Sequence, residues 1–222
     1  MSLKWRYLVL VHFALVFLSC GQQEVLLPEN PDCSAGTSCG SWYPTSGSDG
    51  GVVGLDEGET FPCLVWESAR LNSGDTFLNV GEEYLKAKHS KSAIRSMVFI
   101  LSAGGCPSCT SLIYAMQKRV ADFEATGALI IGVTWRDLSG ADLDYDLDKA
   151  EETLVEQEFW PAADWPLTND EEEHLRDQFQ EGFPRILVIQ MADMKVQSAS
   201  TTAFSPDDEG VADLLQFLSA FP

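Results

Sequence analysis

The stretch SMVFILSAGGCPSC, residues 96–109, carries the clearest structural and chemical signal in the chain. Its first seven residues form a continuous, mainly apolar run, typical of a strand that is buried on both faces. Gly104 and Gly105 break that run. From Cys106 to about Thr126 the sequence predicts one helix, because apolar residues recur there at helical spacing. These residues are Leu112, Ile113, Met116, Val120 and Phe123.

The two cysteines of this stretch have the spacing of a redox pair. Because Cys106 and Cys109 are separated by two residues, the first turn of a helix brings their sulfur atoms within bonding distance. Cys106 then lies among the unpaired N–H groups at the positive end of the helix dipole, which favours the nucleophilic thiolate. Pro107 fits at the helix start because its missing N–H would have no partner there, and Ser108 completes the motif. We interpret Cys106 as the attacking cysteine and Cys109 as the one that resolves the mixed disulfide.

Two other interpretations of the CPSC motif stay open, a permanent structural disulfide and half of a metal site. A zinc site would need a second C-x-x-C or an H-x-x-x-H, and the sequence contains neither. His12 belongs to the N-terminal segment, and His89 and His174 stand alone, as exposed surface residues do. We therefore expect no metal and no dissociable cofactor.

Strand and helix patterns alternate on both sides of this stretch. Before it, the patterns predict strands at 61–66 and 76–80 and a helix at 81–88. After it, they predict a buried strand at 129–134, an acidic helix at 142–158 and an extended piece at 165–167. A helix capped by Asn169 or Asp170 follows. The chain then forms a hairpin of 185–191 and 195–198 and a last helix that starts at Asp207 or Asp208. This order predicts an α/β fold with helices on both faces of a central sheet.

The sequence resembles the thioredoxin-like superfamily over roughly residues 61–221. Three segments carry the resemblance: SMVFILSAGG before CPSC, LIIGVTW after the first helix, and WPLTND…FQEGFPRILVIQ. It is most similar to the exported lipoprotein or membrane-anchored branch, with TlpA-like thiol–disulfide oxidoreductases and the alkyl hydroperoxide reductase/redoxin type. The resemblance implies a thioredoxin-like fold, with a central mixed sheet flanked by helices and an irregular N-terminal extension. It also implies a cis Phe183–Pro184 bond, with Pro184 packed against CPSC and shaping the substrate groove.

The chain departs from the family pattern near the cysteines. Gly105 stands where the family has an aromatic residue, and Ile100 stands where thioredoxins have a buried acid. Proton transfer to Cys109 must therefore use water or another carboxylate. Asp137, at the end of the second buried strand, is a candidate, although a solvated surface carboxylate is the commoner role. Phe183 is bulkier than the usual Thr or Val, so it either narrows the groove or simply packs.

Residues 1–19 have the pattern of a lipoprotein signal peptide. Two cationic residues precede an apolar run at 7–18, which is too short to span a bilayer. The segment VFLSC resembles a bacterial lipobox, which implies cleavage before Cys20 and lipid attachment to it; an ordinary signal with an incidental cysteine is the alternative. We expect an exported protein, lipid-anchored in the bacterial envelope on the periplasmic side of a membrane. Because Gly21 follows Cys20, the outer membrane is slightly favoured.

The mature chain divides by composition into two parts. Residues 20–60 are rich in Gly, Ser, Pro and Asn, which predicts a tether and an irregular cap, and residues 61–222 form the predicted thioredoxin-like domain. Three cysteines remain, Cys33, Cys39 and Cys63. An exported protein tolerates disulfides, so one structural disulfide and one free thiol are the simplest count, with the connectivity open.

Charge and motif spacing exclude several functions. The formal net charge of −20 argues against binding nucleic acid, which needs a basic surface. The alternating aspartates at 142–148 do not make a calcium loop, because Leu147 takes the place of the required glycine and Thr153 that of the bidentate glutamate. Ala103 stands three residues before Cys106, where the peroxiredoxin signature has Thr or Ser, and the preceding strand lacks the signature's proline.

These observations together predict a thiol–disulfide oxidoreductase of the bacterial cell envelope that works through the CPSC pair. Its expected partners are protein thiols and disulfides of the envelope, an electron-donating thiol protein, and the membrane that holds the lipid anchor. Two alternatives are a non-catalytic thioredoxin-fold binding module with CPSC as a structural disulfide, and a peroxiredoxin-type peroxidase.

Overall fold

The computed structural model describes residues 43–44, 52–71, 74–89, 94–134, 152, 165–169, 175, 182–200 and 204–222. Within these ranges, no helix has the length and apolar character needed to cross a membrane. The expected signal peptide, Cys20, Cys33, Cys39, Asp137, the acidic segment 142–148 and His174 lie outside them.

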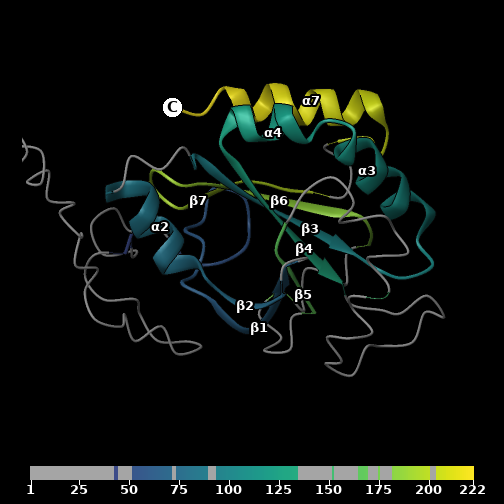
Figure 1. Cartoon of the computed structure of the whole chain (residues 1–222). Helices are drawn as coiled ribbons and strands as arrows, with labels where there is room; N and C mark the ends of the chain where they lie inside the picture. Colours follow the sequence, from purple (N-terminus) through teal and green to yellow (C-terminus); the bar gives the residue numbers. More distant parts are fainter. Residues whose placement is uncertain are drawn as a thin grey trace, which may run out of the picture.

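The described strands form one mixed sheet in the order β2-β1-β5-β4-β3-β6-β7 (Figure 1). The strands are β1 (Val65–Leu71), β2 (Gly74–Asn79), β3 (Ser96–Ser102), β4 (Ala128–Thr134), β5 (Leu167–Thr168), β6 (Arg185–Gln190) and β7 (Lys195–Ser200). β4 runs parallel to both β3 and β5, whereas β6 is antiparallel to β3 and β7. The predicted central mixed sheet is confirmed.

Strand β3 lies inside the sheet, between β4 and β6, and all seven of its residues are buried. Its side chains alternate between the two faces. Met97, Phe99 and Leu101 belong to one buried cluster, and Val98 and Ile100 belong to the other. The continuous apolar run in the sequence therefore follows from a strand that must fill two cores at once.

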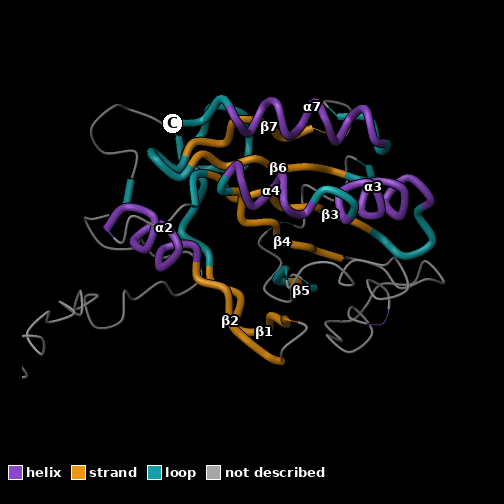
Figure 2. Tube along the Cα trace, turned by 45° about the horizontal axis from the view of Figure 1, so that its top comes forward, coloured by secondary structure: helices purple, strands orange, loops and turns teal. Residues whose placement is uncertain are grey.

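The described helices cover both faces of the sheet. They are α2 (Val80–His89), α3 (Pro107–Gln117), α4 (Val120–Thr126) and α7 (Asp208–Ser219). Helices α3, α4 and α7 lie together on one face, and α7 packs against the other two, whereas α2 lies apart from them (Figures 1 and 2). The core under α3, α4 and α7 contains Leu112, Ile113, Met116, Phe123, Leu214 and Leu218, together with Ile100 and Ile130 of the sheet.

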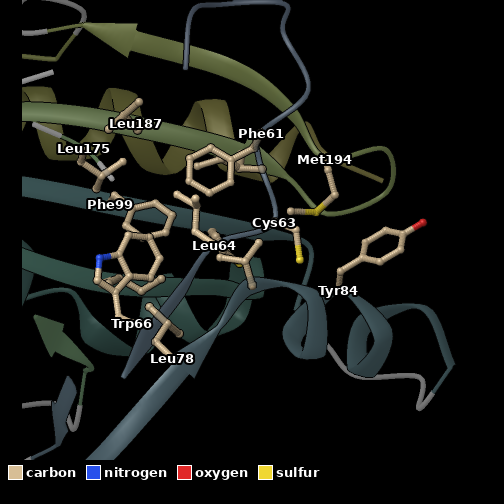
Figure 3. Close-up of a cluster of buried hydrophobic side chains, with 14 of the residues drawn as sticks. Phe61, Cys63, Leu64, Trp66, Leu78, Tyr84, Phe99, Leu175, Leu187 and Met194 are labelled. Carbon is tan, nitrogen blue, oxygen red and sulfur yellow. The ribbon is translucent and has the colours of Figure 1, made fainter. Parts of the chain in front are cut away.

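The opposite face is filled by a second buried cluster, which we call the aromatic core because the rings of Phe61, Trp66 and Phe99 meet in it among aliphatic side chains (Figure 3). The ring centroid of Phe99 lies 5.3 Å from that of Phe61 and 5.5 Å from that of Trp66. Phe61 enters this core because residues just before it pair with the sheet edge. Gly58 N–H donates to Val196 O at 2.8 Å, and Phe61 N–H donates to Met194 O at 2.7 Å.

Several predicted elements differ from the structure in their bounds. The first strand is β1 at Val65–Leu71 rather than at 61–66. Its sequence VWESARL has neither a continuous apolar run nor a regular polar–apolar alternation, and its register with β2 shifts between Trp66 and Ala69. The helix predicted at 106–126 is two helices, α3 and α4, separated at Lys118 and Arg119. No Pro or Gly marks that break in the sequence, and both helices pack against α7. The predictions for α2, β3, β4, the β6–β7 hairpin and α7 are confirmed to within a few residues.

Candidate functional site

The CPSC motif follows the carboxyl end of strand β3. After β3, the chain turns through Gly105, whose φ of 67° lies in the left-handed region that favours glycine. Cys106 then has extended backbone geometry and serves as the N-cap of α3, with Pro107 as the first helical residue. The sequence therefore folds locally as predicted up to this point, because a buried strand, a glycine turn and a proline-started helix follow one another directly.

Cys106 and Cys109 form a disulfide across the first turn of α3, with their Cα atoms 5.3 Å apart. Cys106 is half-buried, whereas Cys109 is fully buried. The backbone N–H of Cys109 donates to Cys106 Sγ at 3.1 Å, and Ser108 Oγ lies 3.4 Å from the same sulfur. The sulfur atom that solvent can reach is thus the one that receives hydrogen bonds.

This arrangement suits a reactive thiolate at Cys106. In the reduced pair, the helix N-terminus and the Cys109 N–H would stabilise negative charge on Cys106 Sγ. A lower-energy thiolate is formed more readily near neutral pH, and the thiolate is the attacking species. Cys109 is shielded from external thiols and is placed to attack Cys106 from within the protein.

Pro184 reaches the same edge of the sheet from β6. Arg185 pairs with Leu101 in the antiparallel register of β3 and β6, so Pro184 comes next to Ser102 at the end of β3. The Phe183–Pro184 bond is cis, as the family resemblance implied, and Pro184 is buried. Phe183 is half-buried and packs against the aromatic core, which favours the packing role over a narrowed groove. Direct packing of Pro184 against CPSC stays a prediction.

The place of the thioredoxin acid is occupied by Ile100, which is buried in the core under α3. His89 is exposed at the end of α2, as expected for a surface residue. Within the described ranges, His, Cys, Asp and Glu side chains do not gather in groups of three or more that would suit a metal ion.

Cys63 takes part in a second disulfide, whose other cysteine lies outside the described residues. The residue is buried at one side of the aromatic core, near Met194 and Tyr84 (Figure 3). Cys63 is one of the three cysteines that the sequence analysis considered for a structural disulfide, and the connectivity of these cysteines stays a prediction.

A row of buried polar residues near the site was missed by sequence reasoning. Ser102, Thr134 and Asn169 lie at the carboxyl ends of β3, β4 and β5 and are almost completely inaccessible to solvent. The sequence predicted Asn169 as a helix cap, because Asn before an acidic run is a common helix start. Each of the three residues lies at the carboxyl end of a buried strand. That shared position becomes clear only once the register of the three strands is known.

Comparisons with known proteins identify the fold through structure rather than sequence. No protein-family model matches the chain, and no curated protein matches it. Thioredoxin peroxidase I from Plasmodium yoelii is similar with a TM-score of 0.53 and 13% identity, over 74% of this chain and 90% of that chain. The peroxidoxin BcpB from Mycobacterium tuberculosis has a TM-score of 0.51 and 17% identity, over 76% of this chain and 99% of that chain. A thiol:disulfide interchange protein from Bacteroides sp. has a TM-score of 0.49 and 15% identity, over 74% of this chain and 91% of that chain.

These similarities establish a thioredoxin-like fold for the chain, with the mixed sheet and flanking helices described above.

Proposed function

We propose that this thioredoxin-fold chain is a thiol–disulfide oxidoreductase that works through Cys106 and Cys109. The observation that carries the proposal is the asymmetry of the pair: the half-buried sulfur lies at a helix N-terminus, and the fully buried sulfur is bonded to it. A disulfide with one approachable sulfur can exchange with an external thiol without unfolding of the domain.

In the reducing direction, Cys106 thiolate attacks one sulfur of a substrate disulfide. The substrate S–S bond breaks, and its other sulfur leaves as a thiolate that takes a proton from solvent. Cys109 then loses its proton and attacks Cys106 Sγ, so the second substrate sulfur leaves and is protonated in turn. Two electrons pass to the substrate, and the Cys106–Cys109 disulfide remains. The reverse sequence oxidises a dithiol.

We further propose a lipid-anchored location for the protein and thiol proteins as its partners. The lipobox-like VFLSC segment supports lipid attachment at Cys20 after removal of residues 1–19. The active pair would then act on protein thiols and disulfides in the bacterial envelope, and a thiol protein would supply electrons.

The reduction potential of the pair tests the proposal. The protein carrying Cys20→Ser is equilibrated in glutathione or dithiothreitol buffers, and the two thiols are quantified by mass spectrometry. We expect a potential between about −300 and −120 mV, the span of exchange-active pairs. A pair that stays oxidised until the domain unfolds would instead indicate a disulfide-stapled binding module.

Matched single variants test the assigned order of the cysteines. Cys109→Ser should form a lasting mixed disulfide with oxidised glutathione through Cys106, whereas Cys106→Ser should react much more slowly because Cys109 is buried. Equal reaction rates would contradict the assignment. Trapping of sulfenic acid on Cys106 by dimedone after hydrogen peroxide, at rates above those of ordinary thiols, would favour a peroxidase.

A further inference from the structure

The most basic stretch of the chain begins in the last turns of α2 and ends just before β3. Residues 86–95, KAKHSKSAIR, contain four of the 14 Lys and Arg residues and no Asp or Glu, in a chain whose net charge is −20. Lys88 near the end of α2 and Arg95 before β3 are both exposed. Such a local excess of positive charge in an acidic protein indicates a surface for an anionic partner.

Lys88 and Arg95 line one pocket beside the C-terminal end of α2, with a volume of about 360 Å³. Tyr84, Ile94 and Met191 contribute to its walls, and the Met191 N–H donates to Arg95 O at 2.9 Å. Among the described residues that line the pocket, the charged side chains are those of Lys88 and Arg95, which we call the pocket cations. The pocket thus combines two positive charges with mainly apolar walls.

The pocket cations have no anionic partner within the protein. In the part of the chain that the structure describes, neither forms an ion pair, and this includes Pro222, which also lines the pocket. Lys88 Nζ donates to the hydroxyl of Tyr84 at 3.2 Å, which is a neutral partner. Lys86, one residue pair earlier, is bound to Glu83 instead. The charges of the pocket cations are therefore available to an anion from outside.

The pocket lies beside the point at which the N-terminal segment joins the described fold. The ring of Tyr43 meets that of Tyr84 edge-on, with 5.5 Å between the ring centroids, and Tyr84 carries the hydroxyl that Lys88 contacts. Tyr43 follows Cys20, the expected site of lipid attachment, by 23 residues. A lipid anchor at Cys20 would thus join the fold next to the pocket cations.

The pocket and the CPSC pair lie at opposite ends of strand β3. Arg95 directly precedes this strand, whereas CPSC follows its carboxyl end. Seven residues of a strand span about 20 Å. Helices α2 and α3 accordingly lie at opposite ends of the molecule (Figures 1 and 2). A membrane in contact with the pocket would leave the CPSC pair directed away from it and open to other proteins.

We propose that the pocket cations bind the phosphate groups of anionic phospholipid headgroups, so that this end of the domain rests on the membrane that carries the anchor. The interaction rests on the lipid-anchored location proposed above. It fixes the orientation of the domain as well as its place, because the anchor, the pocket and the CPSC pair follow one another from the membrane outward.

The negative charge of the whole chain does not oppose this contact strongly. At physiological ionic strength, exposed charges more than about 8 Å apart are largely screened, so the charge close to the pocket decides. Two acidic side chains near the pocket in sequence already have partners. Glu83 pairs with Lys86, and Asp193 accepts the backbone N–H of Lys195 at 3.1 Å.

Sedimentation with lipid vesicles tests the proposal. The mature chain, residues 20–222, carries Cys20→Ser, so that neither the signal segment nor a lipid binds the vesicles. We expect it to bind vesicles of equal parts phosphatidylglycerol and phosphatidylcholine, but not phosphatidylcholine alone, and to be released as the salt concentration rises. Lys88→Gln/Arg95→Gln should bind about 25-fold more weakly, because each cation near an anionic membrane contributes about fivefold.

Lys118→Gln/Arg119→Gln is the matched control. It removes the same charge, but from two cations that pair with Asp208 and Asp122, and it should bind like the unaltered chain. Equal weakening in the two double variants would overturn the proposal, since net charge alone would then explain binding.

Absence of binding to the phosphatidylglycerol vesicles would overturn the proposal as well. If inorganic phosphate shifted the NMR signals of Lys88 and Arg95 while the vesicles did not bind, the pocket would be a site for a soluble anion instead. All variants keep Cys106 and Cys109, so each of these outcomes leaves the reduction-potential test of the proposed function unaffected.

Discussion

Ser108 is the polar side chain closest in sequence to the reactive sulfur. Its hydroxyl lies 3.4 Å from Cys106 Sγ, next to the 3.1 Å contact from the Cys109 N–H. In the disulfide the acceptor of both contacts is the Cys106 sulfur, which accepts hydrogen bonds only weakly. In the reduced pair the same donors would face a thiolate, which accepts hydrogen bonds far more strongly. The reactivity of Cys106 should therefore depend on this one hydroxyl.

We expect Ser108→Ala to slow alkylation of reduced Cys106 by iodoacetamide at pH 6 by about fivefold, the equivalent of one hydrogen bond of about 1 kcal/mol. The measurement is the second-order rate constant, taken as a function of pH. Ser111→Ala, an exposed serine on the same helix, is the control and should leave the rate unchanged. Equal rates for Ser108→Ala and the unaltered protein would show that the hydroxyl does not reach the thiolate.

At the scale of single elements, the N-terminus of helix α7 shows which contacts stabilise a helix start that the sequence predicted. Asp207 is the N-cap, and its Oδ1 accepts the backbone N–H of Gly210 at 3.0 Å. Ser205 Oγ donates to the other carboxylate oxygen at 2.9 Å. These two hydrogen bonds, in that order of importance, lower the pKa of Asp207 below its ordinary value. Gly210 is required there, because a Cβ atom would come against the backbone of Ser205.

The pKa of Asp207 is lower in the folded protein than in the unfolded chain, where it is about 3.9. The ionised carboxylate therefore stabilises the folded protein when the pH is above about 3.9. This stabilisation is lost as the pH falls through the lower pKa of the folded state. We therefore expect Asp207→Ala to lower the urea midpoint at pH 7, and the deficit to shrink as the pH is lowered below about 4. Asp213→Ala, exposed on the same helix, should change the midpoint little. A deficit that is the same at pH 7 and at pH 3 would contradict a capping role for the carboxylate.

At the scale of the whole molecule, the segment before the sheet is held by Tyr43 as well as by Cys63. The Tyr43 hydroxyl donates to Phe61 O at 2.9 Å, and its ring meets that of Tyr84 edge-on at 5.5 Å. Burial, with a smaller effect of Tyr84, raises the pKa of Tyr43 far above its ordinary value, so its hydroxyl stays a donor at physiological pH. The chain before β1 is therefore part of the folded core at this point.

Loss of the second disulfide should weaken this connection. We expect Cys63→Ala to lower the free energy of unfolding by about 2–4 kcal/mol, the usual effect of removing a native disulfide. Urea denaturation without reductant measures it. The Cys106→Ala/Cys109→Ala double variant, which keeps the Cys63 disulfide, is the comparison. If Cys63→Ala unfolded at the same urea concentration as the unaltered protein, this disulfide would not contribute to stability.

The sequence by itself determined strand β3, the turn after it and the position of the CPSC pair. These features are local: a strand that fills two cores must be apolar throughout, and a cysteine at a helix start acquires its environment from the next three residues. The start of α7 at Asp207 was predictable for the same reason, since a helix cap is formed within a few residues.

Only the tertiary structure decided the remaining features, because each depends on residues far apart in the chain. Helices α3 and α4 are separate helices that both pack on α7, and β1, whose sequence lacks a regular strand pattern, becomes a strand between β2 and β5. The orphan amide of Asn169 was likewise invisible in the sequence. The register of β4 and β5 sets it beside Thr134, far from it in the sequence.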